Sequence, residues 1–201
     1  ASGAGSVSAF LPSSVSSALW STHPEVLLLG DLNTFQNGSS DFSKIFNEID
    51  LNRFDSILVG PGLGIAEEKN CFGDDLRDFK GLLVLDADAL NSLSMTSKGW
   101  KWLNDRKGPT WITPHLDEFK RLFPFIDCSN PLNAGIEAAK ICNSSVLLKC
   151  AHSVISDPEG KTWQIGQVNS SVARTGFGDV LAGFVSGMGA SGLASERKLD
   201  T

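Results

Sequence analysis

The sequence predicts an α/β domain of three layers, with helices on both faces of a mostly parallel central sheet. Six short apolar runs are continuous rather than alternating, as expected of strands that are buried on both faces. Segments with helical spacing separate most of these runs, so strands and helices alternate along the chain. A turn containing Pro and Gly near the end predicts a hairpin, which would give the sheet an antiparallel edge.

The expected strands are the β-rich apolar runs. In chain order they cover residues 6–10, 26–29, 56–59, 82–85, 110–113 and 146–149. Helical spacing occurs at residues 12–20, 42–49, 66–79, 116–123 and 132–142, and further helices are expected to start near 89 and 180. Residues 153–156 and 162–168 flank Asp157-Pro-Glu-Gly160, a turn that suits a hairpin. We expect these strands to form one central sheet.

Composition limits the class of protein. With 201 residues and a diffuse net charge of −6, the chain is expected to form a single domain over residues 1–201 that does not bind nucleic acid. No apolar stretch approaches the roughly 18 residues of a membrane span, and the start lacks the basic segment of a signal peptide. The cysteines show no metal-site spacing, which suits a reducing compartment. We therefore expect a cytoplasmic protein without a membrane partner.

The motif with the most chemical content is Thr175-Gly-Phe-Gly-Asp179, which precedes a helical run. Gly176 and Gly178 let the backbone approach a ligand, and amides at the start of a helix can bind a phosphoryl group. Asp179 would then lie beside the phosphate and accept the proton of an attacking hydroxyl. Alternatively, Asp179 is a helix cap, a role that needs no chemistry. The motif alone leaves both roles open.

A second glycine-rich segment, Gly60-Pro-Gly-Leu-Gly64, follows an expected strand. Gly62 and Gly64 could allow a pyrophosphate or sugar to lie against the backbone. The segment resembles a dinucleotide-binding fingerprint, with Asp86 about 20 residues further on. Its spacing is G-x-G-x-G rather than G-x-G-x-x-G, however, and it follows the third expected strand rather than the first. A tight turn without a ligand explains it equally well.

Two carboxylates, Asp86 and Asp88, follow the expected strand 82–85. At a strand end such carboxylates can hold Mg²⁺ through water or accept a hydrogen bond from a substrate hydroxyl. Asp88 could instead cap the helix that starts near Ala89. Asp86 is the better candidate for binding substrate.

Two further polar groups follow the next strands. His115 lies near a helix start and could donate to a substrate oxygen, with Glu118 as the reciprocal half of a capping arrangement. Lys149 ends a buried strand, where its ammonium needs an anionic partner that a nucleotide phosphate would supply. It could also extend to solvent. His152 and Ser153 could add contacts to the same nucleotide or be exposed hairpin residues.

Taken in order, these motifs resemble the ADP- or ATP-dependent NAD(P)H-hydrate dehydratases. The similar segments are G-P-G-L-G, L-D-A-D-A-L-N, T-P-H-x-x-E, L-L-K with its hairpin, and A-x-x-G-x-G-D-V-L-A-G. The opening residues 3–8 and Pro24-Glu-Val26 fit as well. Five ordered motifs over nearly the whole chain are specific, although each alone is not. The resemblance implies a ribokinase-like sandwich and a symmetric homo-oligomer.

The resemblance also implies roles for individual residues. Gly62, Gly64, His115 and Asp179 would line the site for the hydrated cofactor, NADHX or NADPHX. The adenine nucleotide, ADP or ATP, would contact a loop and two glycines. The loop residues are Lys149, Cys150, Ala151, His152 and Ser153, and the glycines are Gly176 and Gly178. Mg²⁺ would accompany the phosphates, with no side chain assigned as its ligand. Asp179 would be the general base that deprotonates the C6 hydroxyl as the phosphoryl group is transferred.

This sequence departs from the family pattern at several positions. Phe177 replaces a small hydroxyl residue, Arg174 stands where Thr is common, and Cys150 stands where Gly is usual. Leu116-Asp117 replace Pro-Gly after His115. The matched segments start after the family's first strand and stop soon after the helix that follows Asp179. We therefore expect the chain to hold part of the domain, without the epimerase domain that is often fused to it.

Two other functions fit the same residues. A ribokinase-type kinase of a hydroxymethylpyrimidine or thiazole alcohol would keep the fold and change the acceptor. A nucleotide-binding module without catalysis would keep only the anion-binding loops. The preference for ADP or ATP cannot be read from these motifs, because both nucleotides present similar phosphates to one loop.

Overall fold

The computed structural model describes residues 2–35, 38–42, 45–64, 72–166 and 175–199. Its strands are β1 (Val7–Pro12), β2 (Val26–Thr34), β3 (Ser40–Asp41), β4 (Ser56–Val59), β5 (Leu82–Leu85), β6 (Thr110–Ile112), β7 (Ser145–Leu148), β8 (Val154–Ser156) and β9 (Thr162–Gln164). Its helices are α1 (Ser13–Thr22), α2 (Ile45–Glu48), α3 (Asp74–Asp78), α4 (Asp88–Met95), α5 (Lys101–Asn104), α6 (Leu116–Leu122), α7 (Pro131–Cys142) and α8 (Phe177–Leu199), with a 3₁₀ turn at Leu51–Arg53.

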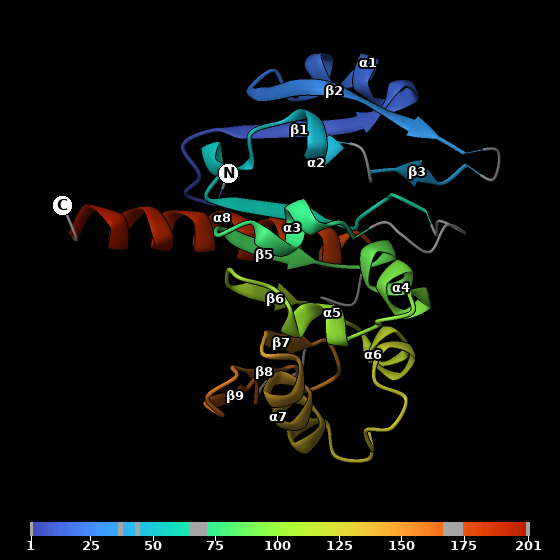
Figure 1. Cartoon of the computed structure of the whole chain (residues 1–201), viewed down its shortest axis with the longest axis vertical. Helices are drawn as coiled ribbons and strands as arrows, with labels where there is room; N and C mark the ends of the chain where they lie inside the picture. Colours follow the sequence, from blue (N-terminus) through green and yellow to red (C-terminus); the bar gives the residue numbers. More distant parts are fainter. Residues whose placement is uncertain (1, 36–37, 43–44, 65–71, 167–174, 200–201) are drawn as a thin grey trace.

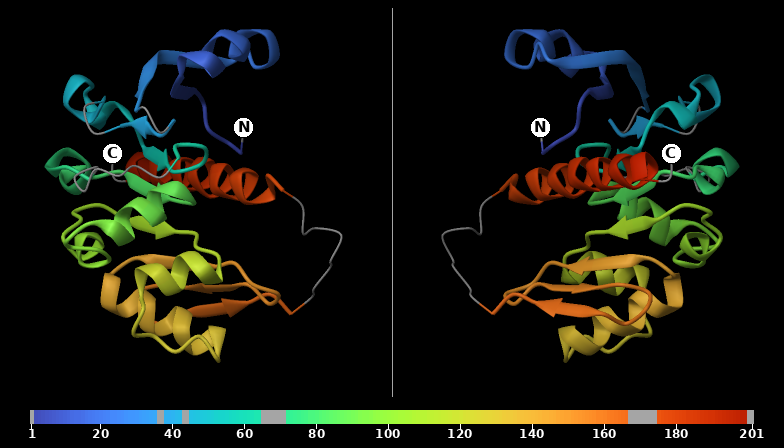
Figure 2. Two further views of the ribbon diagram at one scale, coloured as in Figure 1. Left: turned by 90° about the vertical axis from the view of Figure 1, so that its right-hand side faces the viewer. Right: turned by 90° about the vertical axis from the view of Figure 1, so that its left-hand side faces the viewer.

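The main sheet has six strands in the order β4-β5-β6-β7-β8-β9. Strands β4 to β7 run parallel, and β8 and β9 pair antiparallel at the edge. Figures 1 and 2 show α8 on one face of this sheet and α4, α6 and α7 on the other. All four residues of β5 are buried, as the continuous apolar run predicts. The predicted α/β architecture with an antiparallel edge is confirmed.

A second sheet of three strands, β1-β2-β3, lies beyond β4 (Figure 1). The prediction of a single sheet is therefore wrong for the first strands in the described residues. β2 also differs from expectation, because its side chains alternate: Leu27 and Leu29 are exposed while their neighbours are partly buried. A continuous apolar run thus predicted the strand but not its one-sided burial.

The predicted boundaries agree best in the main sheet. The ranges 56–59 and 82–85 match β4 and β5 residue for residue. Two short elements, β3 and α5, were not predicted, because two and four residues are too few to show a period. Parts of the predicted helices 42–49 and 66–79, and the end of the predicted strand 162–168, lie outside the described residues.

Helix α8 contradicts the expectation that no apolar stretch approaches membrane length. Its residues Phe177–Glu196 are long and apolar enough to cross a membrane by length and composition alone, which is weak evidence for a single helix. In the structure α8 packs along β4 and β5. Ser186 Oγ lies 2.7 Å from Ser56 Oγ of β4, and a Cβ added at Gly189 would collide with Leu82 of β5. Small residues thus let α8 lie close to the sheet.

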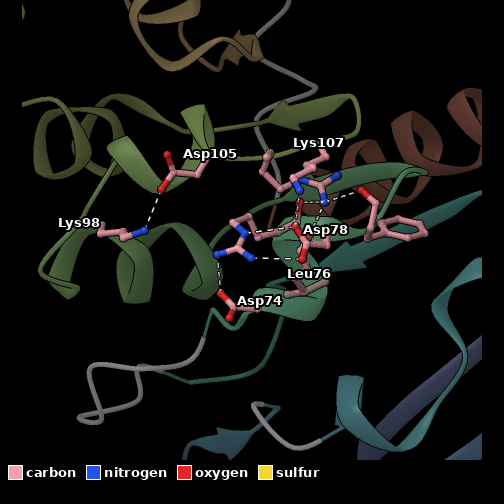
Figure 3. Close-up of polar contacts among 9 residues, drawn as sticks. Asp74, Leu76, Asp78, Lys98, Asp105 and Lys107 are labelled. Atoms are coloured by element: carbon pink, nitrogen blue, oxygen red, sulfur yellow. Dashed lines mark hydrogen bonds and ion pairs between the residues drawn. The ribbon is translucent and has the colours of Figure 1, made fainter.

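At the amino end of the sheet, the buried Arg106 joins the segment between α3 and β5 to the start of β6 through hydrogen bonds. Arg106 is 7% exposed and donates to the backbone carbonyls of Leu76, Phe79 (2.8 Å) and Gly81 (3.1 Å). Its Nε donates to Thr110 Oγ1 at 3.1 Å. Burial lowers the pKa of Arg106 to about 10. Figure 3 shows this cluster beside the exposed ion pairs of Arg77, Lys98 and Lys107.

Replacing this buried guanidinium should destabilise the fold measurably. In Arg106→Met the carbonyls that it satisfies lose their donors, and a buried polar group without a partner costs about 1–3 kcal/mol. We expect the free energy of unfolding, measured by urea denaturation, to fall by that amount. Arg77→Met, which removes a neighbouring arginine from exposed ion pairs, is the control and should have a much smaller effect. Equal stability of the two variants would contradict the assigned role of Arg106.

Candidate functional site

The sequence-predicted residues gather at the carboxyl end of the main sheet. Gly60 follows β4, Asp86 follows β5, His115 follows β6 and Lys149 follows β7. These four strands are parallel neighbours, so the residues that follow them share one edge. In open α/β sheets, ligands bind in the crevice beyond this edge. The edge is therefore the candidate site.

The glycine-rich loop after β4 is held close to the strand beside it. Gly60 has φ +143°, and a Cβ there would lie 1.7 Å from the carbonyl oxygen of Asp86. Gly64 has φ +71°, and a Cβ there would lie 2.9 Å from Ser39 Cα. Both positions require glycine for conformation and for space. A Cβ at Gly62, in contrast, would meet nothing within 4 Å in the described residues, which leave this part of the loop uncovered.

The two carboxylates after β5 have different partners. Asp86 is 1% exposed, and its Oδ1 lies 2.7 Å from Lys149 Nζ. Asp88 is the first residue of α4, and its Oδ2 accepts a hydrogen bond of 2.8 Å from the Gly64 amide. Ala87 between them has φ +47°, a strained conformation for a residue with a Cβ. The interpretation of Asp88 as a helix cap is therefore wrong: it fixes the glycine-rich loop.

Lys149 is held by the protein rather than extended into solvent. Its side chain is 21% exposed and pairs with Asp86, and its amide donates to Pro114 O at 2.8 Å. The alternative of a lysine that extends to solvent is wrong. Its anionic partner in the described residues is the Asp86 carboxylate, which nothing in the sequence near Lys149 indicates. On its other side, a Cβ added at Gly178 would lie 3.5 Å from Lys149 Nζ, so the ammonium is close to the start of α8.

The structure places Asp179 inside the first turn of α8. The helix begins at Phe177, so Asp179 is its third residue rather than the residue before it that would be the cap. Its side chain is exposed. Gly176 has φ +87°, and its carbonyl accepts from the Val180 amide at 3.2 Å. The helix start, where Gly178 is close to Lys149, therefore also contains the Asp179 carboxylate. Arg174, a departure from the family pattern, lies outside the described residues.

His115 caps the helix that follows it. Its Nδ1 accepts from the amides of Asp117 (3.1 Å) and Glu118 (3.4 Å), while the His115 amide donates to Glu118 Oε2 at 2.8 Å. The reciprocal cap with Glu118 is thus confirmed. Because Nδ1 accepts, Nε2 carries the proton and faces Glu118 Oε1 at 3.2 Å. The ring is half exposed at the site edge, and its role toward a substrate stays a prediction.

The segment Cys150–Ser153 after Lys149 forms a closed turn. Ser153 Oγ donates to the Cys150 carbonyl at 3.1 Å and accepts from its amide at 3.4 Å. His152 Nδ1 lies 3.2 Å from the Ile165 carbonyl, and Ala151 and His152 are exposed. Burial raises the pKa of the Cys150 thiol. The Ser153 hydroxyl thus shapes the loop, and its contacts to a nucleotide stay a prediction.

These contacts connect part of the predicted site. A hydrogen bond joins Gly64 to Asp88, and an ion pair and a close approach join Asp86, Lys149 and Gly178. Sequence reasoning missed the pairing of Asp86 with Lys149 and the close approach of Gly60 to Asp86. The glycine at position 60 was the available signal for the second of these. Two surface hollows in the described residues lie elsewhere, one of them lined by Lys107, Pro109 and Ser145 at the amino end of the sheet.

Comparison with known proteins gives consistent results. A family model described as NAD(P)H-hydrate dehydratase (Carb_kinase) matches residues 1–199. The bifunctional NAD(P)H-hydrate repair enzyme Nnr of Synechocystis sp. is 38% identical over 200 residues, which cover 100% of this chain and 36% of that protein. The corresponding enzyme of Gloeobacter violaceus is 40% identical over 137 residues, 68% of this chain and 26% of that protein. The chain spans about a third of the length of these relatives.

Solved structures show the same fold. The ADP/ATP-dependent NAD(P)H-hydrate dehydratase of Bacillus subtilis, co-crystallised with ATP/Mg²⁺ and soaked with CoA, matches with a TM-score of 0.73 and 25% identity. The match covers 94% of this chain and 65% of that one. A ribokinase-like superfamily protein from Enterococcus faecalis matches with a TM-score of 0.67 and 23% identity, covering 94% of this chain and 63% of that one. The ribokinase-like expectation for the fold is confirmed.

Proposed function

This chain belongs to the NAD(P)H-hydrate dehydratase family. We propose that it removes water from the S-epimer of NADHX or NADPHX, with ADP or ATP as the phosphoryl donor. One observation carries this proposal: the Lys149 ammonium lies beside Gly178 at the start of α8, one residue before Asp179. A cation, helix-terminal amides and an exposed carboxylate are the groups that phosphoryl transfer to a hydroxyl requires.

In the proposed reaction, phosphorylation precedes elimination. Asp179 accepts the proton of the C6 hydroxyl while the hydroxyl oxygen attacks the terminal phosphorus of the nucleotide. The nucleotide then leaves with one phosphate fewer. The lone pair of the ring nitrogen then expels phosphate from C6, and loss of a proton from C5 restores the ring double bond. The amides around Gly176 and Gly178 stabilise charge on the transferred group, an electrostatic contribution that is usually large.

We assign the nucleotide phosphates to Lys149 and the first turn of α8, and the hydrated ring to the open side of the Gly62 loop. The turn Cys150–Ser153 follows Lys149 directly and supports the assignment of the adenosine part to this side. The substrate is a soluble cofactor, so we place the activity in the cytoplasm. The homo-oligomer implied by the resemblance belongs to the same proposal.

The B. subtilis relative was co-crystallised with ATP/Mg²⁺, and the described side chains of this chain do not form a separate cage for a metal ion. Asp86 and Asp88 have protein partners, and the described residues contain no group of three His, Cys, Asp or Glu that could hold a metal ion. We therefore assign Mg²⁺ to the phosphate oxygens of the nucleotide, where it would neutralise charge.

The proposal is tested by incubating the chain with NADHX, Mg²⁺ and either ADP or ATP. We expect absorbance of reduced nicotinamide to return together with an equal amount of free phosphate. No recovery with either nucleotide would reject the proposal. A stable phosphorylated product from a hydroxymethylpyrimidine or thiazole alcohol, without free phosphate, would instead identify a kinase.

A further inference from the structure

The ion pair between Asp86 and Lys149 joins two strands at the site. The two residues are 63 positions apart in sequence, yet Asp86 Oδ1 and Lys149 Nζ are 2.7 Å apart. The carboxylate is 1% exposed, whereas the lysine side chain is 21% exposed. The buried member of the pair therefore faces the protein, and the lysine is the member that a ligand could reach.

The backbone fixes the direction of the Asp86 carboxylate. Its amide donates to the Val59 carbonyl at 3.1 Å, and Gly60 packs against its carbonyl with no room for a Cβ. The strained Ala87 and the bond from the Gly64 amide to Asp88 hold the chain on its other side. Such strain persists only where the surroundings determine the conformation, and it is concentrated at functional sites. Asp86 is thus a rigid group, while a lysine has a long flexible stem.

The ammonium lies between this rigid carboxylate and the first turn of α8. A Cβ added at Gly178 would lie 3.5 Å from Lys149 Nζ, so the ammonium is close to the start of α8. An ammonium has three hydrogen-bond donors, and the pair with Asp86 uses one of them. The other two have no partner among the described residues, so they could bind an anion at the start of α8.

We propose that Asp86 is a positioning residue for the nucleotide: it holds Lys149 Nζ at the start of α8 and does not itself bind the hydrated cofactor or a metal ion. This inference rests on the proposed function for the identity of the ligand. A preordered lysine loses less conformational freedom when phosphate binds, so Asp86 strengthens nucleotide binding without touching it.

The test is calorimetric titration with ATP and Mg²⁺ of the wild-type chain, Asp86→Asn, Lys149→Met and the double variant. We expect Asp86→Asn to weaken nucleotide binding about tenfold or more, a loss typical of one charged contact. In the double variant the Asp86 substitution should add almost nothing to the loss caused by Lys149→Met, because it acts only through the lysine. Asp105→Asn breaks an exposed Lys–Asp pair of the same 2.7 Å length and should leave affinity unchanged.

Several results would overturn the inference. Among them are wild-type affinity in Asp86→Asn and a double variant whose loss equals the product of the two single losses. Should Asp86→Asn fail to fold, Asp86→Glu keeps the charge but shifts it by one methylene, and it must weaken ATP binding for the inference to stand. A wild-type chain without measurable ATP affinity would also overturn it. ATP binding without recovery of NADH would reject the proposed dehydration while leaving the role of Asp86 supported.

In an active enzyme, Michaelis constants provide a second readout. Asp86→Asn should raise KM for the nucleotide and leave KM for NADHX near its wild-type value. A rise confined to KM for NADHX would mean that Asp86 binds that substrate directly, and would overturn the inference.

Discussion

Asp179→Asn should lower the rate of NADHX dehydration by about 10²–10⁴-fold, the usual contribution of a general base. The amide has nearly the shape of the carboxylate but cannot accept the hydroxyl proton. Because the Lys149 ammonium and the α8 amides are unchanged, nucleotide affinity should stay close to that of the wild type. The measurement is turnover followed by the absorbance of reduced nicotinamide, with ATP affinity determined by calorimetry on the same samples.

A matched control distinguishes the loss of a general base from the loss of a negative charge in the first turn of a helix. Asp75 is an exposed carboxylate in the first turn of α3, away from the carboxyl end of the sheet. Asp75→Asn should therefore turn over NADHX at the wild-type rate. If Asp179→Asn retained turnover within a few-fold of wild type, the base would have to be another group and the assigned role of Asp179 would be wrong.

Lys149→Met should have the largest effect on stability. The Asp86 carboxylate, which is 1% exposed, would remain in place without its cation. Breaking a buried pair in this way typically costs about 3–5 kcal/mol. We expect the free energy of unfolding in urea to fall by that amount and ATP binding to weaken more than it does in Asp86→Asn. Adding Asp86→Asn should recover much of the stability, because the second substitution removes the unpaired charge.

Lys98→Met is the matched control for this prediction. It breaks the pair with Asp105, which has the same 2.7 Å separation but is exposed (Figure 3). Exposed pairs are screened by solvent, so we expect little change in stability and none in ATP binding. A Lys149→Met variant as stable as Lys98→Met would show that the Asp86 carboxylate is not held by its lysine.

Much of the main sheet could be predicted from the sequence because its signals are local. The runs 56–59 and 82–85 are apolar throughout and are followed by Gly60 and Asp86, so both the strands and the residues at their ends could be identified. The cap formed by His115 and Glu118 is equally local, since its partners are three residues apart. In these places a short stretch of chain contains all of the interacting groups.

The remaining features depend on groups that are distant in sequence. Nothing near Lys149 in the chain indicates that Asp86 is its partner, because parallel strands bring them together only in the folded sheet. The exposed side of β2 was missed for a related reason. The apolar run 26–29 does not show whether one face of the strand or both faces are covered by other parts of the chain. The long apolar stretch of α8 was missed because its Gly, Ala and Ser residues weaken the apolar pattern while permitting close packing on β4 and β5.

The most direct measurement is a crystal structure of this chain with a non-hydrolysable ATP analogue and Mg²⁺. We expect the terminal phosphate to accept hydrogen bonds from Lys149 Nζ and from an amide at the start of α8, with the Asp179 carboxylate facing it from the side of the Gly62 loop. An analogue bound instead in the hollow lined by Lys107, Pro109 and Ser145, at the opposite end of the sheet, would contradict it.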